Sequence, residues 1–378
     1  MERDKNSIVF LAGQLGLGGA EKQLFLLIES LIHHNYKITV IDFYPQQQGY
    51  WRKPIENLGV NLISHYSQSK LKRIFRITNE LRKIKPNIVH GWHFHTNGYA
   101  NLCGKLARVP IRIGSVRENP DYWSKPNFIN FSCLYGLDGI IFNSKISYKN
   151  FYEKTIFTKK GIFPKTYIVH NGIHPPNPYA KEELREELED KRIRIPYDSK
   201  VIKIIGIGRL DKNKNWQLLI NSCAAIKNFG INFYCLIIGD GPERIKIQQQ
   251  IAHHNLSDQI TLSGQITNAS RFLPLFDILC SCSNSEGLPN VILEAASYGL
   301  PVLATDVGGT REVIEPSVNG LLVKKNNLEE FSENLWYLIK NNKARVNMGV
   351  EGKKKIYSHF SVDQMVKNTI KVYHDLAK

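Results

Sequence analysis

Hydrophobic positions along the chain alternate between two spacings. Short runs of β-branched and other apolar residues are separated by longer stretches in which apolar residues recur every three or four positions, as in an amphipathic helix. Strands that alternate with helices are typical of a parallel, doubly wound α/β sheet. In the first half, the short runs predict strands at Ile8–Leu11, Ile38–Phe43, Ile88–His90, Arg112–Ser115 and Gly139–Asn143.

A proline cluster interrupts this alternation, which then starts again. Residues 175–178 and the highly charged stretch Lys181–Arg194 indicate a linker followed by an exposed helix. We therefore predict an α/β fold of two doubly wound Rossmann-like domains, residues 1–178 and 179–360, facing each other across a cleft at the carboxyl ends of their strands. The second series of predicted strands is Lys203–Gly206, Tyr234–Ile238, Ile260–Leu262, Ile278–Ser281, Val302–Ala304 and Gly320–Val323.

Residues 361–378 form a third segment. We predict a terminal helix over Val362–Ala377 that packs on one of the two domains, with the N-terminal domain as a candidate. The apolar residues that recur there at nearly helical spacing are Met365, Val366, Ile370, Val372 and Leu376.

The amino-acid composition indicates the cellular compartment of the protein. A chain of 378 residues with 42% hydrophobic and 22% charged residues is typical of a soluble protein with two domains. The first apolar run, Ile8–Ala12, is too short for a signal peptide or a membrane span, and the six scattered cysteines are expected to be free and buried. We expect a cytoplasmic protein.

The net charge of +16 is distributed unevenly. Residues 1–180 carry 24 Lys and Arg against 11 Asp and Glu, whereas residues 181–378 carry 26 against 23. The N-terminal half is therefore expected to face something anionic, which could be a membrane surface, a phosphorylated acceptor or nucleic acid.

Two basic segments also contain apolar residues. Lys70–Lys85 is amphipathic, and residues 145–165 interleave lysines with aromatic residues. This mixture suits peripheral binding to an anionic membrane surface on its cytoplasmic face, although an ordinary surface helix with solvated lysines fits the pattern equally well. The aromatic residues of the second segment are Tyr148, Phe151, Tyr152, Phe157 and Phe163.

Two loops that follow predicted strands could bind an anion. Gly16–Glu21 opens a helix after the first strand, so its flexible backbone lets an anion approach closely, although a simple tight turn would look the same. After the first strand of the second half, Arg209 and Lys214 have a spacing suited to holding a diphosphate from two directions. The alternative is ordinary surface charge.

The segment from Ser285 to Ala296 carries the strongest signal. It joins a strand to a helix, and Pro289 marks the first helical turn, so the amides near Gly287 and Leu288 form an anion-binding helix N-terminus. Glu286 and Glu294 flank that site, and a carboxylate accepts hydrogen bonds from the vicinal hydroxyls of sugars and ribose.

Taken together, these motifs resemble the GT-B family of retaining glycosyltransferases called family 4. The resemblance implies that Arg209 and Lys214 bind a donor diphosphate, that Glu286 with Gly287 and Leu288 binds the transferred sugar, that Glu294 binds ribose, and that Gly18 and Gly19 close the site. It also implies catalysis with no metal or other cofactor. The motifs are Gly-Gly-Ala-Glu at 18–21, Gly-Arg-Leu at 208–210 with Lys214, Gly-Asp-Gly-Pro at 239–242, Glu-Gly-Leu-Pro-Asn at 286–290 with Glu294, and Gly-Leu-Pro-Val at 299–302.

Three histidines compete for a further role at the end of a first-half strand. The family commonly places there a histidine that contacts the donor sugar or acceptor, and His90, His93 and His95 are candidates. The resemblance favours His95, while any of the three could equally be a core or supporting group.

The resulting prediction is a hexosyltransferase that moves a sugar from a nucleotide-diphosphate donor, with UDP-sugar favoured by the resemblance, to a sugar or lipid-linked acceptor hydroxyl with retention. Such a reaction belongs to cell-surface polysaccharide or glycolipid synthesis. A nucleotide-sugar epimerase on the same fold is the alternative. A nucleic-acid-binding protein would explain the charge but would leave the four residues Arg209, Lys214, Glu286 and Glu294 without a purpose.

Overall fold

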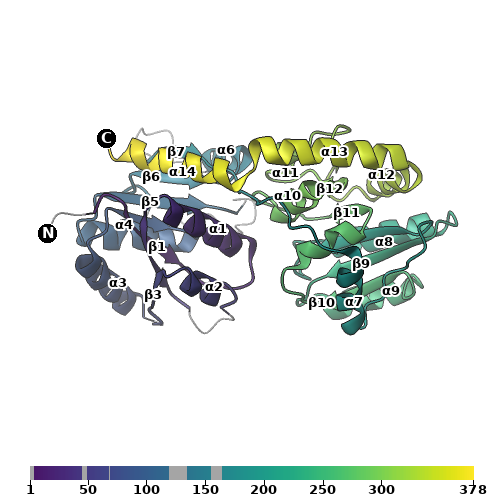
Figure 1. The fold of residues 1–378 in the computed structure, drawn as a ribbon, viewed down its shortest axis with the longest axis horizontal. Coiled ribbons are helices and arrows are strands. Elements are labelled where there is room, and N and C mark those ends of the chain that lie inside the picture. Colours follow the sequence, from purple (N-terminus) through teal and green to yellow (C-terminus); the bar gives the residue numbers. More distant parts are fainter. Residues whose placement is uncertain (1–3, 45–48, 68, 119–133, 155–163) are drawn as a thin grey trace. The chain divides into compact units, whose positions relative to one another are not determined.

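The computed structural model describes residues 4–44, 49–67, 69–118, 134–154 and 164–378. They form two compact units, Met1–Gly172 with Ser361–Lys378, and Ile173–Phe360. Each unit is a parallel sheet flanked by helices (Figure 1). The predicted pair of Rossmann-like α/β domains is confirmed.

The N-terminal unit contains a seven-stranded sheet in the order β3-β2-β1-β4-β5-β6-β7. Its strands are β1 Ser7–Ala12, β2 Lys37–Asp42, β3 Asn61–Ser64, β4 Ile88–Gly91, β5 Ile111–Val116, β6 Gly139–Phe142 and β7 Lys165–Ile168. Its helices are α1 Gly19–His33, α2 Arg52–Asn57, α3 Lys70–Ile84, the 3-10 turn η1 Phe94–Thr96, α4 Asn97–Leu106, α6 Lys145–Lys154 and α14 Val362–Leu376.

The C-terminal unit contains a six-stranded sheet in the order β10-β9-β8-β11-β12-β13. Its strands are β8 Ile202–Ile207, β9 Phe233–Ile238, β10 Ile260–Gly264, β11 Ile278–Ser281, β12 Val302–Thr305 and β13 Gly320–Val323. Its helices are α7 Lys181–Asp190, α8 Trp216–Lys227, α9 Arg244–His253, η4 Ala269–Leu275, α10 Asn290–Ser297, α11 Thr310–Val313, α12 Leu328–Lys340 and α13 Asn342–His359.

Both sheets reverse their strand order beside the first strand of the unit. In the N-terminal sheet β1 pairs in parallel with β2 on one side and β4 on the other, and in the C-terminal sheet β8 pairs with β9 and β11. The loops that leave β1 and β4, or β8 and β11, therefore start side by side at the carboxyl edge, which is where open α/β sheets bind their ligands.

The terminal helix α14 belongs to the N-terminal unit, where it contacts α1. Met365, Val366 and Val372 are buried in the same apolar cluster as Phe10 of β1. Buried Tyr373 also places its hydroxyl 3.0 Å from His90 Nδ1. The end of the chain thus completes a core that the first strands begin.

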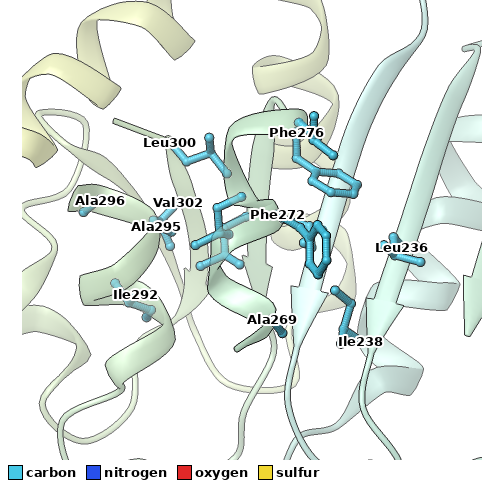
Figure 2. Close-up of a cluster of buried hydrophobic side chains, with 14 of the residues drawn as sticks. Leu236, Ile238, Ala269, Phe272, Phe276, Ile292, Ala295, Ala296, Leu300 and Val302 are labelled. Atoms are coloured by element: carbon cyan, nitrogen blue, oxygen red, sulfur yellow. The ribbon is translucent and has the colours of Figure 1, made fainter. Parts of the chain in front are cut away.

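The apolar face of α10 fixes the helix against the C-terminal sheet. Figure 2 shows Ile292 and Ala295 of this helix in one cluster with Phe272 and Phe276, and all four are buried. Because this contact anchors α10, it also fixes the loop that precedes the helix.

Two short strands, β3 and β7, were missing from the sequence prediction. Both are edge strands with a half-buried centre and exposed ends, so neither has a sustained apolar run.

The prediction of buried free thiols is confirmed for five cysteines, while Cys133 lies outside the described residues. Those five are Cys103, Cys223, Cys235, Cys280 and Cys282.

Over the described residues, none of the helices combines the length and the apolar character that crossing a bilayer requires. The basic segment 145–165, which contains α6, matches the expectation of exposed aromatic residues only in part. Phe151 is buried in the core, whereas Tyr152 is exposed, and Phe157 and Phe163 lie outside the described residues.

We expect Tyr373→Phe to destabilise the N-terminal unit by about 1–3 kcal/mol, because it removes the hydroxyl partner of a fully buried imidazole nitrogen. Hydrogen exchange of the β4 and α14 amides would measure the loss. The matched control is Tyr337→Phe on α12, where the side chain is 40% exposed and a change below about 0.5 kcal/mol is expected. Equal protection in wild type and Tyr373→Phe would contradict this view of α14.

Candidate functional site

An ion pair joins the two loops at the carboxyl edge of the C-terminal sheet. Lys214, in the loop after β8, places its Nζ 2.5 Å from Oε1 of Glu286 in the loop after β11. Ser283 donates its hydroxyl hydrogen to the same carboxylate oxygen at 2.6 Å. The structure therefore brings together two residues that the sequence separates by 72 positions.

Backbone contacts hold the same two loops in register. The Asn284 amide donates to the Asn213 carbonyl at 2.6 Å, and the Asn213 side-chain amide donates to the Ser285 carbonyl at 3.0 Å. Thr305 at the end of β12 donates to the Ser283 carbonyl at 2.6 Å. A network of hydrogen bonds thus fixes the position of the Glu286 carboxylate.

Arg209 places an exposed cation at this edge. Its side chain is 71% exposed, and its Nε lies 3.9 Å from Asp211 Oδ2. The Arg209 carbonyl accepts a hydrogen bond from Trp216 Nε1 at 2.9 Å, which anchors the backbone while the guanidinium projects outward. An exposed guanidinium can turn toward an anion without breaking a buried contact.

The predicted helix N-terminus begins one residue later than expected. Pro289 is the N-cap of α10 and supplies no side-chain cap, while Gly287 and Leu288 are buried immediately before it. Glu294 follows on α10 as a half-buried side chain. Its charge helps to raise the pKa of Tyr298 to about 12, although desolvation of the phenol contributes more.

Close backbone packing below this loop requires a glycine. Gly308 has a φ of 53°, and a Cβ there would overlap with the carbonyl oxygen of Glu286. The next residue, Gly309, donates its amide hydrogen to the Gly287 carbonyl at 2.7 Å. The turn after β12 therefore supports the Glu286 loop from beneath.

At the corresponding edge of the N-terminal sheet, a histidine joins the loops after β1 and β4. The Gly13 amide donates to His93 Nδ1 at 3.1 Å, so neutral His93 carries its proton on Nε2. That nitrogen lies 3.4 Å from Oε1 of buried Glu21, which also accepts from Gln14 Nε2 at 3.1 Å. Burial opposes ionisation of Glu21, but the contacts with His93 and Gln14 outweigh it and lower the pKa of the carboxyl group.

His95 lies over the same loop. Its ring stands where a Cβ of Gly13 would be and stacks on His93 with 5.6 Å between ring centroids. Although the residue is exposed, desolvation by the surrounding protein, followed by an electrostatic contribution from His93, lowers the pKa of His95 to about 4. His95 is therefore a neutral hydrogen-bonding group at physiological pH.

His90 differs from the other two histidines because it is enclosed. Its Nε2 lies 2.8 Å from Ser115 Oγ and its Nδ1 lies 3.0 Å from Tyr373 Oη, so both ring nitrogens contact the protein core. Burial, together with the charge of Arg117, holds the pKa of His90 well below its usual value. The geometry gives His90 a supporting place in the core.

Gly18, in the loop between β1 and α1, packs closely against Glu21. Gly18 is the N-cap of α1 and Gly19 its first residue, and a Cβ at Gly18 would overlap with Glu21 Oε2. Glu21 was predicted only as part of the Gly-Gly-Ala-Glu motif, and its pairing with His93 was not expected from the sequence. An available signal was the position of a carboxylate in the first turn of a helix beside the predicted anion site.

These residues fall into two groups, each within one domain. The C-terminal group combines Arg209, Lys214 and Glu286, and so offers positive charge beside a hydrogen-bond-accepting carboxylate. The N-terminal group contains His95 and the glycines of the loop after β1. The C-terminal group by itself can bind a phosphorylated, hydroxyl-rich ligand.

Comparisons with known proteins agree on one family. The profile described as Glycosyl transferases group 1 matches residues 187–355. An uncharacterized glycosyltransferase of Methanocaldococcus jannaschii is 30% identical over 96% of this chain and 95% of its own length. A Campylobacter jejuni α-1,4-N-acetyl-D-galactosaminyltransferase, named for an acceptor on PP-undecaprenol, is 23% identical over 84% of each chain. The crystal structure of Anabaena HepE in complex with UDP-glucose has a TM-score of 0.83 at 17% identity, covering 98% of this chain and 99% of its own.

We expect Gly308→Ala to destabilise the C-terminal unit more than Gly230→Ala. Both glycines have positive φ, 53° and 67°, so an alanine costs about 1–2 kcal/mol at either position. Only at Gly308 does the new Cβ also meet backbone, since nothing lies within 4 Å of a Cβ at Gly230. Thermal unfolding of both variants would measure the difference, and equal losses would contradict the supporting role of the turn.

Proposed function

We propose, since this chain belongs to the glycosyl transferases group 1 family, that it transfers a sugar from a UDP-sugar to an acceptor hydroxyl with retention at the anomeric carbon. The observation that carries the proposal is the Lys214–Glu286 pair beside exposed Arg209 at the carboxyl edge of the C-terminal sheet. This edge offers both charge for a diphosphate and an acceptor for sugar hydroxyls. The UDP-glucose complex of the HepE neighbour supports uridine as the base.

In this proposal the donor lies along the loops after β8 and β11. Arg209 and Lys214 bind the diphosphate, and Glu286 with the amides of Gly287 and Leu288 binds the transferred sugar. Glu294 on α10 binds the ribose hydroxyls. The ion pair already present means that the diphosphate shares Lys214 with Glu286, while Arg209 turns in from solvent.

The chemical step breaks the bond between the anomeric carbon and the donor phosphate oxygen. The acceptor oxygen forms its bond on the same face of the sugar, and its proton passes to an oxygen of the departing UDP. Arg209 and Lys214 stabilise the charge that develops on the diphosphate, a task that metal ions perform in other transferases. We therefore expect EDTA to leave the rate of transfer unchanged.

In this proposal, the residues at the carboxyl edge of the N-terminal sheet supply neutral groups. Because the pKa of His95 is about 4, its imidazole can hydrogen-bond to a sugar hydroxyl without carrying charge at pH 7. Gly18 and Gly19 let the loop after β1 approach the ligand, and His93 with Glu21 positions that loop through the Gly13 amide.

We expect UDP to raise the melting temperature of the wild-type protein and to have a much smaller effect on Arg209→Met and Lys214→Met. Losing one charge-assisted contact to the diphosphate should weaken UDP binding by about tenfold or more. Lys212→Met is the matched control, because Lys212 is an exposed lysine of the same loop. A UDP response that is identical in all four proteins would remove the diphosphate role of this loop.

Product analysis separates transfer from epimerisation. With a UDP-sugar and an acceptor, we expect a glycoside of unchanged anomeric configuration, identified from the anomeric proton coupling, and Glu286→Ala should reduce its formation by at least about a hundredfold. An epimerised nucleotide sugar formed without acceptor would instead identify the epimerase alternative. Full transferase activity of Glu286→Ala would refute the assignment of that carboxylate.

The acceptor is proposed to be presented at an anionic membrane surface, on the cytoplasmic side. Support comes from what we call the α3 surface, which is formed by exposed Tyr66, Leu71 and Phe75 with neighbouring basic residues. Leu71 is 78% exposed and Phe75 67% exposed, so these apolar side chains face solvent rather than the core. The C. jejuni relative, named for an acceptor on PP-undecaprenol, supports a lipid-linked acceptor. The basic members of the surface are Lys70, Lys72 and Arg76.

We expect the protein to sediment with vesicles that contain phosphatidylglycerol and to remain in solution with phosphatidylcholine vesicles. Leu71→Ser combined with Phe75→Ser should abolish most of this binding, because it removes the apolar contribution while leaving the lysines. Leu102→Ser with Leu106→Ser on α4 is the control, since these leucines are also exposed but lie outside the α3 surface. Equal sedimentation with both lipids, or no sedimentation, would contradict the membrane proposal.

A further inference from the structure

Arg117 occupies the carboxyl edge of the N-terminal sheet and takes no part in the site described above. It follows β5 directly, and its guanidinium carbon lies 3.3 Å from the ring centroid of Trp92. One terminal nitrogen, Nη1, donates to Asn171 Oδ1 at 3.3 Å. Stacking and this hydrogen bond fix the plane of the guanidinium and the direction of its remaining edge.

Among the described residues, that remaining edge has no partner. Arg117 Nε is buried without a hydrogen bond, and no carboxylate of the described residues lies within ion-pair distance of the guanidinium. The residue is half-buried, and desolvation by the surrounding protein lowers the pKa of Arg117 to about 9, so the side chain still carries its charge at neutral pH. A desolvated charge without a counterion is costly, and proteins usually pair it.

Arg112 at the other end of the same strand shows the usual arrangement. Its Nε and Nη2 both donate to the carboxylate of Asp138, at 3.2 and 3.0 Å. Arg112 therefore has a carboxylate partner, whereas the described residues provide none for Arg117.

A second unpartnered atom lies next to Arg117. Strands β5 and β6 pair with Val116 opposite Phe142, so Arg117 and Asn143 leave neighbouring strands at the same level. Asn143 Nδ2 donates to the Arg117 carbonyl at 2.9 Å, which fixes the amide orientation, and Asn143 Oδ1 is buried without a hydrogen bond. Helix α6 begins two residues later at Lys145, so its N-terminus adds a positive end to the same place.

We propose that Arg117 and Asn143, with Asn171 holding the guanidinium, form a binding site for a phosphate group of the acceptor. The free Nε and Nη2 edge of Arg117 binds two phosphate oxygens side by side, and Asn143 Oδ1 accepts a hydrogen from a hydroxyl of the same ligand. The positive charge of residues 1–180 favours phosphate as the anion. That the phosphate belongs to the acceptor rests on the proposed function; the anion site itself does not.

The test observes Arg117 directly. Full-length protein with ¹⁵N-labelled arginine gives Nε–H signals, and the signal of Arg117 is identified by its loss in Arg117→Lys. Titration with inorganic phosphate, at constant ionic strength against chloride, should shift this signal saturably. The Arg112 signal should stay in place, because its Nε is already bonded to Asp138. The absence of a saturable Arg117 shift at tens of millimolar phosphate would overturn the proposal.

A second variant guards against an unspecific response. Asn143→Asp places a carboxylate beside Arg117, which should occupy the free edge and weaken phosphate binding by about tenfold or more. Unchanged phosphate affinity in this variant would overturn the proposal, as would a shift that acetate produces as strongly as phosphate, since the site would then select carboxylates.

Two phosphate esters distinguish the sources of the group. Tighter binding of glucose 1-phosphate assigns the site to a water-soluble acceptor, and tighter binding of dioctanoyl phosphatidic acid assigns it to a lipid-linked acceptor. Failure of both to shift the Arg117 signal refutes the site. Since none of these measurements needs turnover, phosphate binding without any sugar transfer would refute only the proposed function.

Discussion

The reversal of strand order beside β1 and beside β8 is the constraint that positions the candidate residues of each domain. In a parallel sheet, the loops that follow the strands all lie at the carboxyl edge. Where the strand order reverses, the loops of two neighbouring strands lead to opposite faces of the sheet and leave a crevice between them. There the Gly13 amide meets His93, and Lys214 meets Glu286. In each domain, the reversal of strand order thus brings together residues that are distant in sequence. The contact is a hydrogen bond in the N-terminal domain and an ion pair in the C-terminal domain.

Charge is handled differently at the two edges. In the C-terminal domain, the charges of Lys214 and Glu286 neutralise each other. Arg209 is exposed to solvent, so its charge carries little desolvation free energy. In the N-terminal domain Arg117 keeps its charge in a partly desolvated place, where it costs more. An anionic ligand would therefore offset a larger desolvation cost at Arg117 than at Arg209.

The sequence predicted most of the fold because the central strands are apolar along their whole length. It missed β3 and β7, whose exposed ends break the apolar run at the sheet edges. Among the candidate residues, the motifs located Lys214 and Glu286 but could not show their direct contact, which depends on the register between two loops. Nor could they separate His90 from His95, because only the packing of Tyr373 and Gly13 distinguishes an enclosed ring from an exposed one.

The return of α14 to the N-terminal unit makes that unit discontinuous in sequence. During synthesis, β1 to β7 leave the ribosome long before Met365 and Tyr373, which complete their core. The middle unit, Ile173–Phe360, is continuous and can fold as soon as it emerges. The second domain can therefore fold while the first is still incomplete, and apolar surface on α1 stays uncovered until α14 has been synthesised.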